Sequence, residues 1–182
     1  MAKTAVIFKS NYGATKQYAL HIAQETGADL YDFNRIKEFD FEKYDTLIFG
    51  GGLYAGKLNG LKHIAKSADK LAGKNLVVYS VGLGDPSVAS NAQVILKSIN
   101  KALPKELMSR THIYSFRGSL DWNNMKFMHK TMMNMLNKML SKKKEEKLTA
   151  DDREMLSNFG KTVDYTNMDT ALPLIEYVKS LS

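Results

Sequence analysis

The chain has 182 residues, 44% of them hydrophobic and 25% charged, which predicts one globular domain over residues 1–182 with a substantial core. The absence of cysteine excludes disulfides, thiolate metal sites and cysteine nucleophiles, and the four histidines do not stand at metal-ligand spacing, so we expect no metal. The formal net charge is +7, no apolar stretch is long enough to cross a membrane and no secretory segment precedes the first strand pattern, so we expect a cytoplasmic protein.

The first predicted unit is a strand followed by a helix. A continuous apolar run within residues 4–9 is typical of a buried parallel strand, and apolar residues at helical spacing predict a helix near 13–25. Between them, hydroxyl and amide side chains and one glycine can bind phosphate oxygens, helped by the first amides of the helix. An ordinary turn capped by serine would give the same pattern. The segment predicts either such a turn or a phosphate loop made of Ser10, Asn11, Tyr12, Gly13, Ala14 and Thr15.

A strand near 29–33 and another near 45–50 come next, and the latter runs into three consecutive glycines. Consecutive glycines cost chain entropy, so they indicate a backbone that comes close to something flat or bends unusually. Apolar residues at helical spacing then predict a helix near 58–71. We predict that the loop over residues 51–58 contacts a ligand through Gly52, Leu53, Tyr54, Ala55 and Gly56.

The same loop has the spacing Gly51-x-x-x-x-Gly56-Lys57 of a phosphate loop from nucleotide triphosphatases. Position 58 is leucine, whereas such a loop needs serine or threonine there to hold Mg²⁺, and no other strand ends in an aspartate placed to complete the metal site. The dinucleotide-binding fingerprint is absent as well, because a single glycine follows the first strand. We therefore expect neither of these nucleotide-binding functions.

Strands near 75–81 and 111–116, with helices near 88–101 and 167–181, complete an alternating α/β pattern. This pattern predicts a doubly wound five-stranded parallel sheet in the order 2-1-3-4-5, with its crevice between strands one and three. The loop after the fourth strand lies next along the same edge. We predict that its backbone faces the ligand at Val81, Gly82, Leu83, Gly84 and Asp85.

Residues 121–150 form a basic, methionine-rich insertion after the fifth strand, and from Asp121 to Lys147 they supply +4 of the net charge. A helical projection places one apolar stripe opposite a polar face that carries Phe127. The stripe either caps the core or contacts anionic lipid or a hydrophobic substrate. We expect the insertion to be separable from the ligand site. The stripe is Met125, Met128, Met132, Met135, Leu136 and Met139, and the polar face holds Lys126, Lys130, Asn134, Asn137 and Lys138.

From Lys3 to the last helix the chain resembles flavodoxins, and the spacing S-x-x-G-x-T from Ser10 to Thr15 is similar to their phosphate loop. The resemblance implies FMN as the cofactor, with its phosphate at loop 10–15, its ring beside the second loop and its pyrimidine edge at the third. The chain departs from the family in its basic charge, in Asn11 where a hydroxyl residue is usual, and in lacking the tryptophan that many flavodoxins stack on the ring next to Tyr54.

The Arg117-Gly118-x-Leu120 strand end and the basic insertion sharpen this likeness, because together they resemble flavodoxin-type menaquinone-dependent protoporphyrinogen oxidases. That resemblance implies oxidation of a porphyrinogen-like substrate with a quinone acceptor, in peripheral contact with an anionic membrane on the cytoplasmic face. A soluble electron carrier that docks a protein redox partner stays open, as does a homodimer. We expect no nucleic acid, because the insertion has no arginine, and no side chain stands out as catalytic. The membrane-contact residues would be Lys126, Phe127, Lys130 and Lys138.

Overall fold

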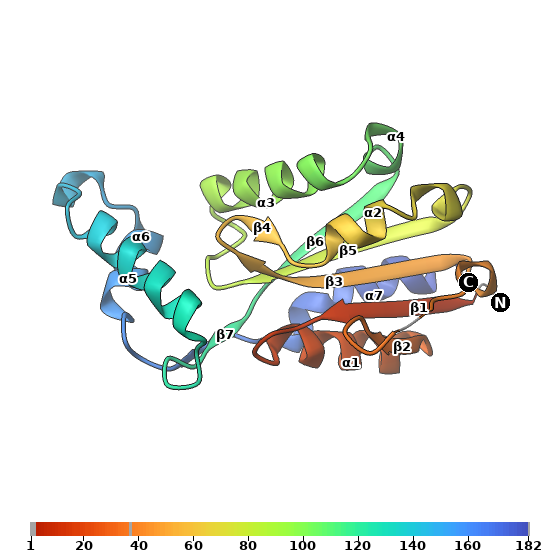
Figure 1. The fold of residues 1–182 in the computed structure, drawn as a ribbon, viewed down its shortest axis with the longest axis horizontal. Helices are drawn as coiled ribbons and strands as arrows, with labels where there is room; N and C mark the ends of the chain where they lie inside the picture. Colours follow the sequence, from red (N-terminus) through yellow and green to blue (C-terminus); the bar gives the residue numbers. More distant parts are fainter. Residues whose placement is uncertain (1–2, 37, 182) are drawn as a thin grey trace.

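The structure is a computed structural model that describes residues 3–36 and 38–181; residues 1, 2, 37 and 182 of the predicted domain lie outside this part. Its elements alternate between strands and helices along the chain (Figure 1). In order they are β1 (Thr4–Lys9), α1 (Ala14–Thr26), β2 (Asp29–Asp32), η1 (Phe41–Lys43), β3 (Thr46–Tyr54), β4 (Lys57–Leu58), α2 (Leu61–Ala65), η2 (Ala68–Leu71), β5 (Asn75–Gly82), α3 (Ala89–Ala102), α4 (Lys105–Met108), β6 (Thr111–Arg117), β7 (Ser119–Leu120), α5 (Phe127–Leu140), η3 (Glu145–Lys147), α6 (Ala150–Ser157), β8 (Val163–Asp164), η4 (Met168–Ala171) and α7 (Leu172–Lys179).

The main sheet confirms the predicted fold class. Its long strands are all parallel and follow the order β2-β1-β3-β5-β6, which is the expected order once the short β4, paired back on β3, is set aside. Val6 on β1 is in register with Leu30 on β2 and Ile48 on β3. The order reverses between β1 and β3, so the crevice lies at the carboxyl ends of these two strands.

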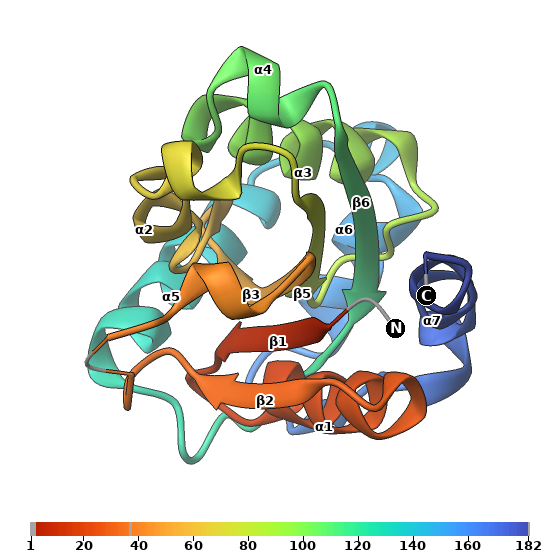
Figure 2. The ribbon, with the colours of Figure 1, turned by 90° about the vertical axis from the view of Figure 1, so that its right-hand side faces the viewer.

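Two apolar layers cover the two faces of the sheet, because alternate residues of each strand point to opposite sides. On one face, Val6 and Ile48 pack under α1 and α7 with the fully buried Tyr18 and Ile22. On the other face, side chains of β1, β3 and β5 pack under α2, η2 and α3. Figure 2 shows these helices on either side of the sheet. Burial on both faces explains why the strands read as continuous apolar runs.

The structure corrects the prediction after the second long strand. Strand β3 continues to Tyr54, and a two-residue turn at Ala55 and Gly56 returns the chain as β4, so residues 51–58 form a hairpin rather than an open loop. The predicted helix near 58–71 is divided into α2 and η2. Gly60 has φ +89°, and a side chain there would meet Lys9 and Phe49 at 2.9 Å, so α2 begins only after it.

Two of the three glycines of β3 make room for aromatic rings, whereas Gly51 lies against the Asn59 carbonyl and Leu58. A Cβ atom on Gly50 would lie 2.0 Å from the ring of Tyr79, and one on Gly52 would lie 2.6 Å from the ring of Tyr54. Neither ring could keep its place against a side chain at these positions. The glycine run therefore allows Tyr79 to be fully buried and Tyr54 to lie flat over the end of β3.

The basic insertion forms a distinct group of helices at the carboxyl end of the sheet, away from both chain termini (Figure 1). The insertion begins after β7 and ends before β8, and these two strands pair antiparallel as a small separate sheet. We call residues 121–162 the insertion lobe. It is longer than the predicted insertion, because α6 follows α5 and packs against it.

Candidate functional site

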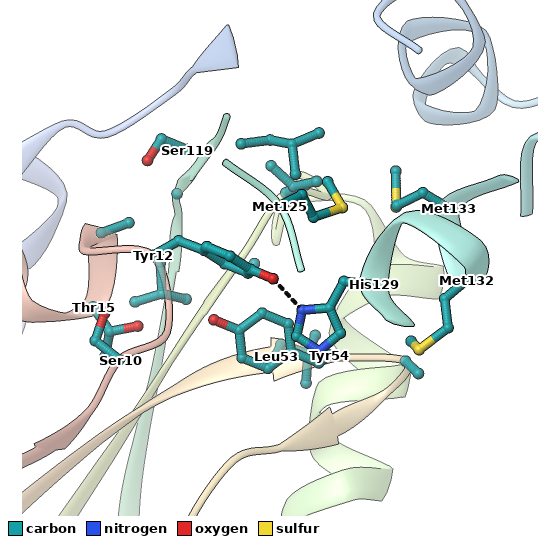
Figure 3. A pocket seen from close by; sticks show the side chains of 17 residues that line it. Ser10, Tyr12, Thr15, Leu53, Tyr54, Ser119, Met125, His129, Met132 and Met133 are labelled. Atoms are coloured by element: carbon teal, nitrogen blue, oxygen red, sulfur yellow. Dashed lines mark hydrogen bonds between the residues drawn. The ribbon is translucent and has the colours of Figure 1, made fainter. Parts of the chain in front are cut away.

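A cleft opens where the loops after β1, β3 and β5 meet beneath the insertion lobe (Figure 3). It contains about 690 Å³ of empty space, part of which is open to solvent. All three predicted loops contribute to it, so the structure brings them together as the strand order required. The lining residues are Ser10, Tyr12, Ala14, Thr15, Leu53, Tyr54, Ala55, Val81, Gly82, Leu83, Gly118, Ser119, Leu120, Met125, His129, Met132 and Met133.

The loop after β1 offers donors to an anion at one end of the cleft. The hydroxyl oxygen of Ser10 accepts a hydrogen bond from the Gly13 amide at 3.0 Å, and Gly13 has φ +103°, which turns the chain into α1. In the described part of the chain no partner is recorded for the amides of residues 14–16, and the first turn of α1 has no acidic residue. The buried Thr15 places its hydroxyl beside them. This donor set fits a phosphate group.

Tyr54 lies on the floor of the cleft, with its ring against Gly52. Burial raises the pKa of Tyr54 to about 12, so its hydroxyl stays neutral at any pH near neutrality. Leu53 and Ala55 flank it and make this wall apolar. Ala55 has φ +47°, a conformation that non-glycine residues adopt rarely, and it forms the tight turn that exposes Tyr54 to the cleft.

Helix α5, through His129, Met132 and Met133, forms the roof of the cleft together with Met125, which precedes the helix. The hydroxyl of Tyr12 shares a hydrogen bond with Nδ1 of His129 and accepts another from the Lys126 amide at 3.2 Å. The imidazole also stacks on Tyr54, with ring centroids 5.0 Å apart and planes 15° from parallel. The inner face of the insertion therefore lines the same cleft as the three loops, so the structure does not separate the two as we expected; their separability in cofactor binding stays a prediction.

The third loop contributes through Val81, Gly82 and Leu83 only. The next two residues face the insertion lobe: Gly84 lies in a smaller neighbouring pocket, and the Asp85 amide donates to Asp151 of α6 at 3.3 Å. The carboxylate of Asp85 accepts from the amide and hydroxyl of Ser87, and these bonds lower its pKa. Gly84 and Asp85, which we predicted to face a ligand, therefore face the insertion lobe instead.

Four other predicted residues lie next to the cleft without lining it. Asn11 and Gly13 belong to the first loop and shape its turn, Gly52 supports the ring of Tyr54, and Gly56 completes the β3–β4 turn. They act on the site through backbone geometry. Their predicted contact with a cofactor stays a prediction.

Sequence reasoning missed seven lining residues, all from the segment after β6. Gly118 approaches Val81 so closely that a Cβ would lie 2.7 Å from its methyl group, and the Gly118 amide donates to the Gly82 carbonyl at 2.8 Å. The Arg117-Gly118-x-Leu120 pattern carried this signal but was interpreted only as a family resemblance. The missed residues are Gly118, Ser119, Leu120, Met125, His129, Met132 and Met133.

The outer face of α5 is exposed. The side chains of Phe127, Met128, Met135 and Met139 are 85%, 67%, 70% and 55% accessible, whereas Met125 is buried. The predicted methionine stripe is therefore divided: Met125 and Met132 face the cleft, whereas Met128, Met135 and Met139 face solvent. We call the four exposed side chains the outer patch. As predicted, Phe127 projects away from the covered side.

Polar contacts tie the insertion lobe to the third loop. Arg117 at the end of β6 donates from Nε to the Leu83 carbonyl at 3.1 Å and forms an ion pair with Glu154 of α6 at 2.8 Å. Its guanidinium also lies 3.7 Å from the ring centroid of Tyr165. Arg117 thus holds α6, the third loop and the chain after β8 in one arrangement.

We expect Glu154→Gln to loosen this arrangement. The pair is partly exposed, so its loss should lower the free energy of unfolding by about 0.5–1 kcal/mol. Urea unfolding followed by the fluorescence of Trp122 measures the effect, since this is the single tryptophan and it packs on Phe159 within the lobe. Glu145→Gln is the control, because Glu145 pairs with Arg153 at a more exposed position. Equal losses in the two variants would contradict the role of Arg117.

The described residues contain neither a cluster of metal ligands nor a helix that could span a membrane. No group of three or more histidine, aspartate or glutamate side chains in that part of the chain could hold a metal ion. None of the helices that the structure describes has the length and apolar character needed to cross a bilayer.

The chain is similar to one family of domains and to several known proteins. A family model described as a flavodoxin domain matches residues 5–147. An uncharacterised protein of Methanocaldococcus jannaschii is 35% identical over 74 residues, which cover 40% of this chain and 48% of that protein, so the chain spans about half the length of this relative. A solved flavodoxin from Agrobacterium tumefaciens is 14% identical, with 100% of both chains covered and a TM-score of 0.44. A flavoprotein in complex with FMN from Lactobacillus acidophilus is 15% identical, with 64% of this chain and 93% of that chain covered and a TM-score of 0.42.

Proposed function

Because the chain belongs to the flavodoxin family of domains, we propose that it binds FMN in the cleft beneath α5 and works as a redox flavoprotein. One observation carries the proposal: donors that suit a phosphate at loop 10–15 and a largely apolar wall at Leu53, Val81 and Met132 line the same cleft. When bound, FMN would supply reversible electron transfer. The protein would set its orientation and its access to partners.

The residues of the cleft divide this work between its two ends. Ser10, Thr15 and the free amides of α1 would hold the phosphate, where the helix dipole favours negative charge. Leu53, Val81 and the methionines of α5 would enclose the ring and exclude water from it. The apolar side chains of the roof are compatible with an apolar reaction partner that enters the open side of the cleft beside α5.

The finer proposal concerns the two redox partners. The resemblance to menaquinone-dependent protoporphyrinogen oxidases suggests a bulky porphyrinogen-like donor and a quinone acceptor, and the thioether-rich roof suits both because methionine adapts to varied apolar shapes. The outer patch and the lysines around it suggest that the reaction takes place at an anionic membrane surface. Lys126, Lys130 and Lys138 all lie on the segment that carries this patch.

We expect replacement of Lys126, Lys130 and Lys138 by glutamate to abolish binding to anionic liposomes, since each lysine near such a surface contributes about 1 kcal/mol at low salt. Co-sedimentation with and without anionic lipid measures it. The control variant has glutamate in place of Lys62, Lys66 and Lys105, which are exposed outside the insertion lobe. It therefore carries the same net charge as the first triple variant. The membrane proposal fails if both triple variants bind alike or the wild-type protein does not bind.

A soluble electron carrier is the second candidate, favoured by the exposed Phe127 and Met128 at the edge of the covered site. In that case the same lysines would dock an acidic protein partner. The two candidates are distinguished by the liposome assay together with reduction of an acidic redox protein such as a cytochrome. Loss of cytochrome reduction in the glutamate variant, with no liposome binding by the wild type, would favour the carrier.

A further inference from the structure

The roof of the cleft contains one group suited to proton transfer near neutral pH. Among the described residues that line the cleft there is no aspartate, glutamate, lysine or arginine, and its polar side chains are Ser10, Tyr12, Thr15, Tyr54, Ser119 and His129. Hydroxyl groups do not ionise near neutrality, and burial keeps Tyr54 neutral as well. An imidazole changes its charge between about pH 5 and 8. His129 is therefore the acid–base group available to a reaction in this cleft.

The contacts of His129 hold its ring in a defined orientation. Its Nδ1 atom bonds to the hydroxyl of Tyr12, which the Lys126 amide also contacts, and its face lies on Tyr54. No hydrogen bond to Nε2 is recorded in the described part of the chain, and this atom belongs to a residue that lines the cleft. Two charged side chains, Lys126 and Lys130, lie close to His129 in the sequence. The ammonium group of Lys130 donates to the Asn123 carbonyl at 3.3 Å.

From this arrangement we propose that His129 is a catalytic acid–base residue, with Tyr12 as its positioning residue. This inference rests on the proposed function. The Tyr12 oxygen would accept from Nδ1–H in both charge states of the imidazole, which leaves Nε2 to gain and lose the proton. A hydroxyl with two lone pairs can accept this bond together with the one from the Lys126 amide.

The step balances with a quinone as acceptor. The reduced cofactor would supply two electrons and one proton, in effect a hydride, for one O–H bond of the hydroquinone. The Nε2–H bond of His129 would break, its proton would form the second O–H bond, and His129 would be left neutral. It then regains a proton from solvent at the open side of the cleft. A positioned general acid of this kind accelerates such a step by about 10²–10⁴.

Stopped-flow oxidation of the FMN-loaded, dithionite-reduced protein tests the proposal. With p-benzoquinone the wild-type rate should fall as the pH rises, since the donor must be protonated. His129→Gln should be slower at low pH by about a hundredfold or more and independent of pH. With ferricyanide, which takes electrons without protons, the two proteins should react alike. His63→Gln, at an exposed histidine of α2, should match the wild type with both acceptors.

Two further measurements do not depend on turnover. Nitrogen-15 NMR of the cofactor-free protein should show the proton of neutral His129 on Nδ1, and Tyr12→Phe should let that proton distribute between Nδ1 and Nε2, because the Nδ1–H group loses its acceptor. A proton on Nε2, or a benzoquinone profile that His129→Gln leaves unchanged, would overturn the inference. If the wild-type protein binds FMN in these experiments, such a result leaves the proposed function intact. If the wild type binds no FMN, the proposed function fails and the inference with it.

Discussion

Replacing Thr15 with alanine should weaken FMN binding by about tenfold to a hundredfold and leave the fold intact. The hydroxyl is buried at the start of α1, and a hydrogen bond to a charged phosphate is worth roughly 1.5–3 kcal/mol. The backbone of Thr15 is held independently, because its carbonyl accepts from the buried hydroxyl of Tyr79 at 3.2 Å. Quenching of flavin fluorescence measures the affinity. Ser10→Ala should act in the same direction.

Riboflavin provides the control for this prediction, since it has the ring without the phosphate. Its affinity should be lower than that of FMN for the wild type and unchanged by Thr15→Ala. Thr26→Ala, at the other end of α1, where the hydroxyl donates to the Ile22 carbonyl, should leave FMN affinity as it is. A parallel loss of riboflavin and FMN binding would show that the substitution disturbs the ring site and that loop 10–15 does not hold the phosphate.

Removal of the insertion lobe should weaken FMN binding by about a hundredfold. Ser119 pairs with Asp164 and Leu120 with Val163, so a two-residue Asn-Gly turn can replace residues 121–162 and join the two strands as a hairpin. The variant loses Met125, His129, Met132 and Met133 from the roof. Leaving roughly 100 Å² of apolar ring surface in water costs about 2.5 kcal/mol, which corresponds to this factor.

The matched control keeps the lobe and changes its outer patch. Met128, Met135 and Met139 are exposed, so their joint replacement by serine should leave FMN affinity within a few-fold of the wild type. Circular dichroism of the deletion variant checks that the sheet is retained. If the deletion variant binds FMN as tightly as the full chain, the roof makes no contribution and the loops alone form the site.

The sheet and its loops could be predicted because their signals are local. Strands such as β1 and β5 are buried on both faces and read as uninterrupted apolar runs, and each is followed by glycine or small polar residues. The strand order then places the first and second loops together, which the cleft confirms. The flavodoxin family match is consistent with that interpretation, whereas the specific oxidase resemblance finds no support in the comparisons.

The remaining features depend on tertiary contacts that no local pattern contains. The periodicity of α5 shows which residues share a face, but not that Met132 faces the cleft while Met128 and Met135 face solvent. Strands of two residues, such as β7 and β8, form only because the two ends of the lobe meet. The positive φ of Gly60 delays the start of α2, although the helical pattern begins before it. No local pattern shows that His129 lies beside Tyr12 and Tyr54, which are distant from it in the sequence.

Amide and methyl NMR spectra recorded during titration with FMN test the central claim most directly, namely that three loops and α5 together enclose the cofactor. We predict shifts at the amides of residues 13–15, 53–55 and 81–83 and at the methyl groups of Met125, Met132 and Met133. The methyl groups of Met128, Met135 and Met139 should stay unchanged. Shifts confined to the loops, shifts in the outer patch alone, or no shifts with saturating FMN would contradict the account.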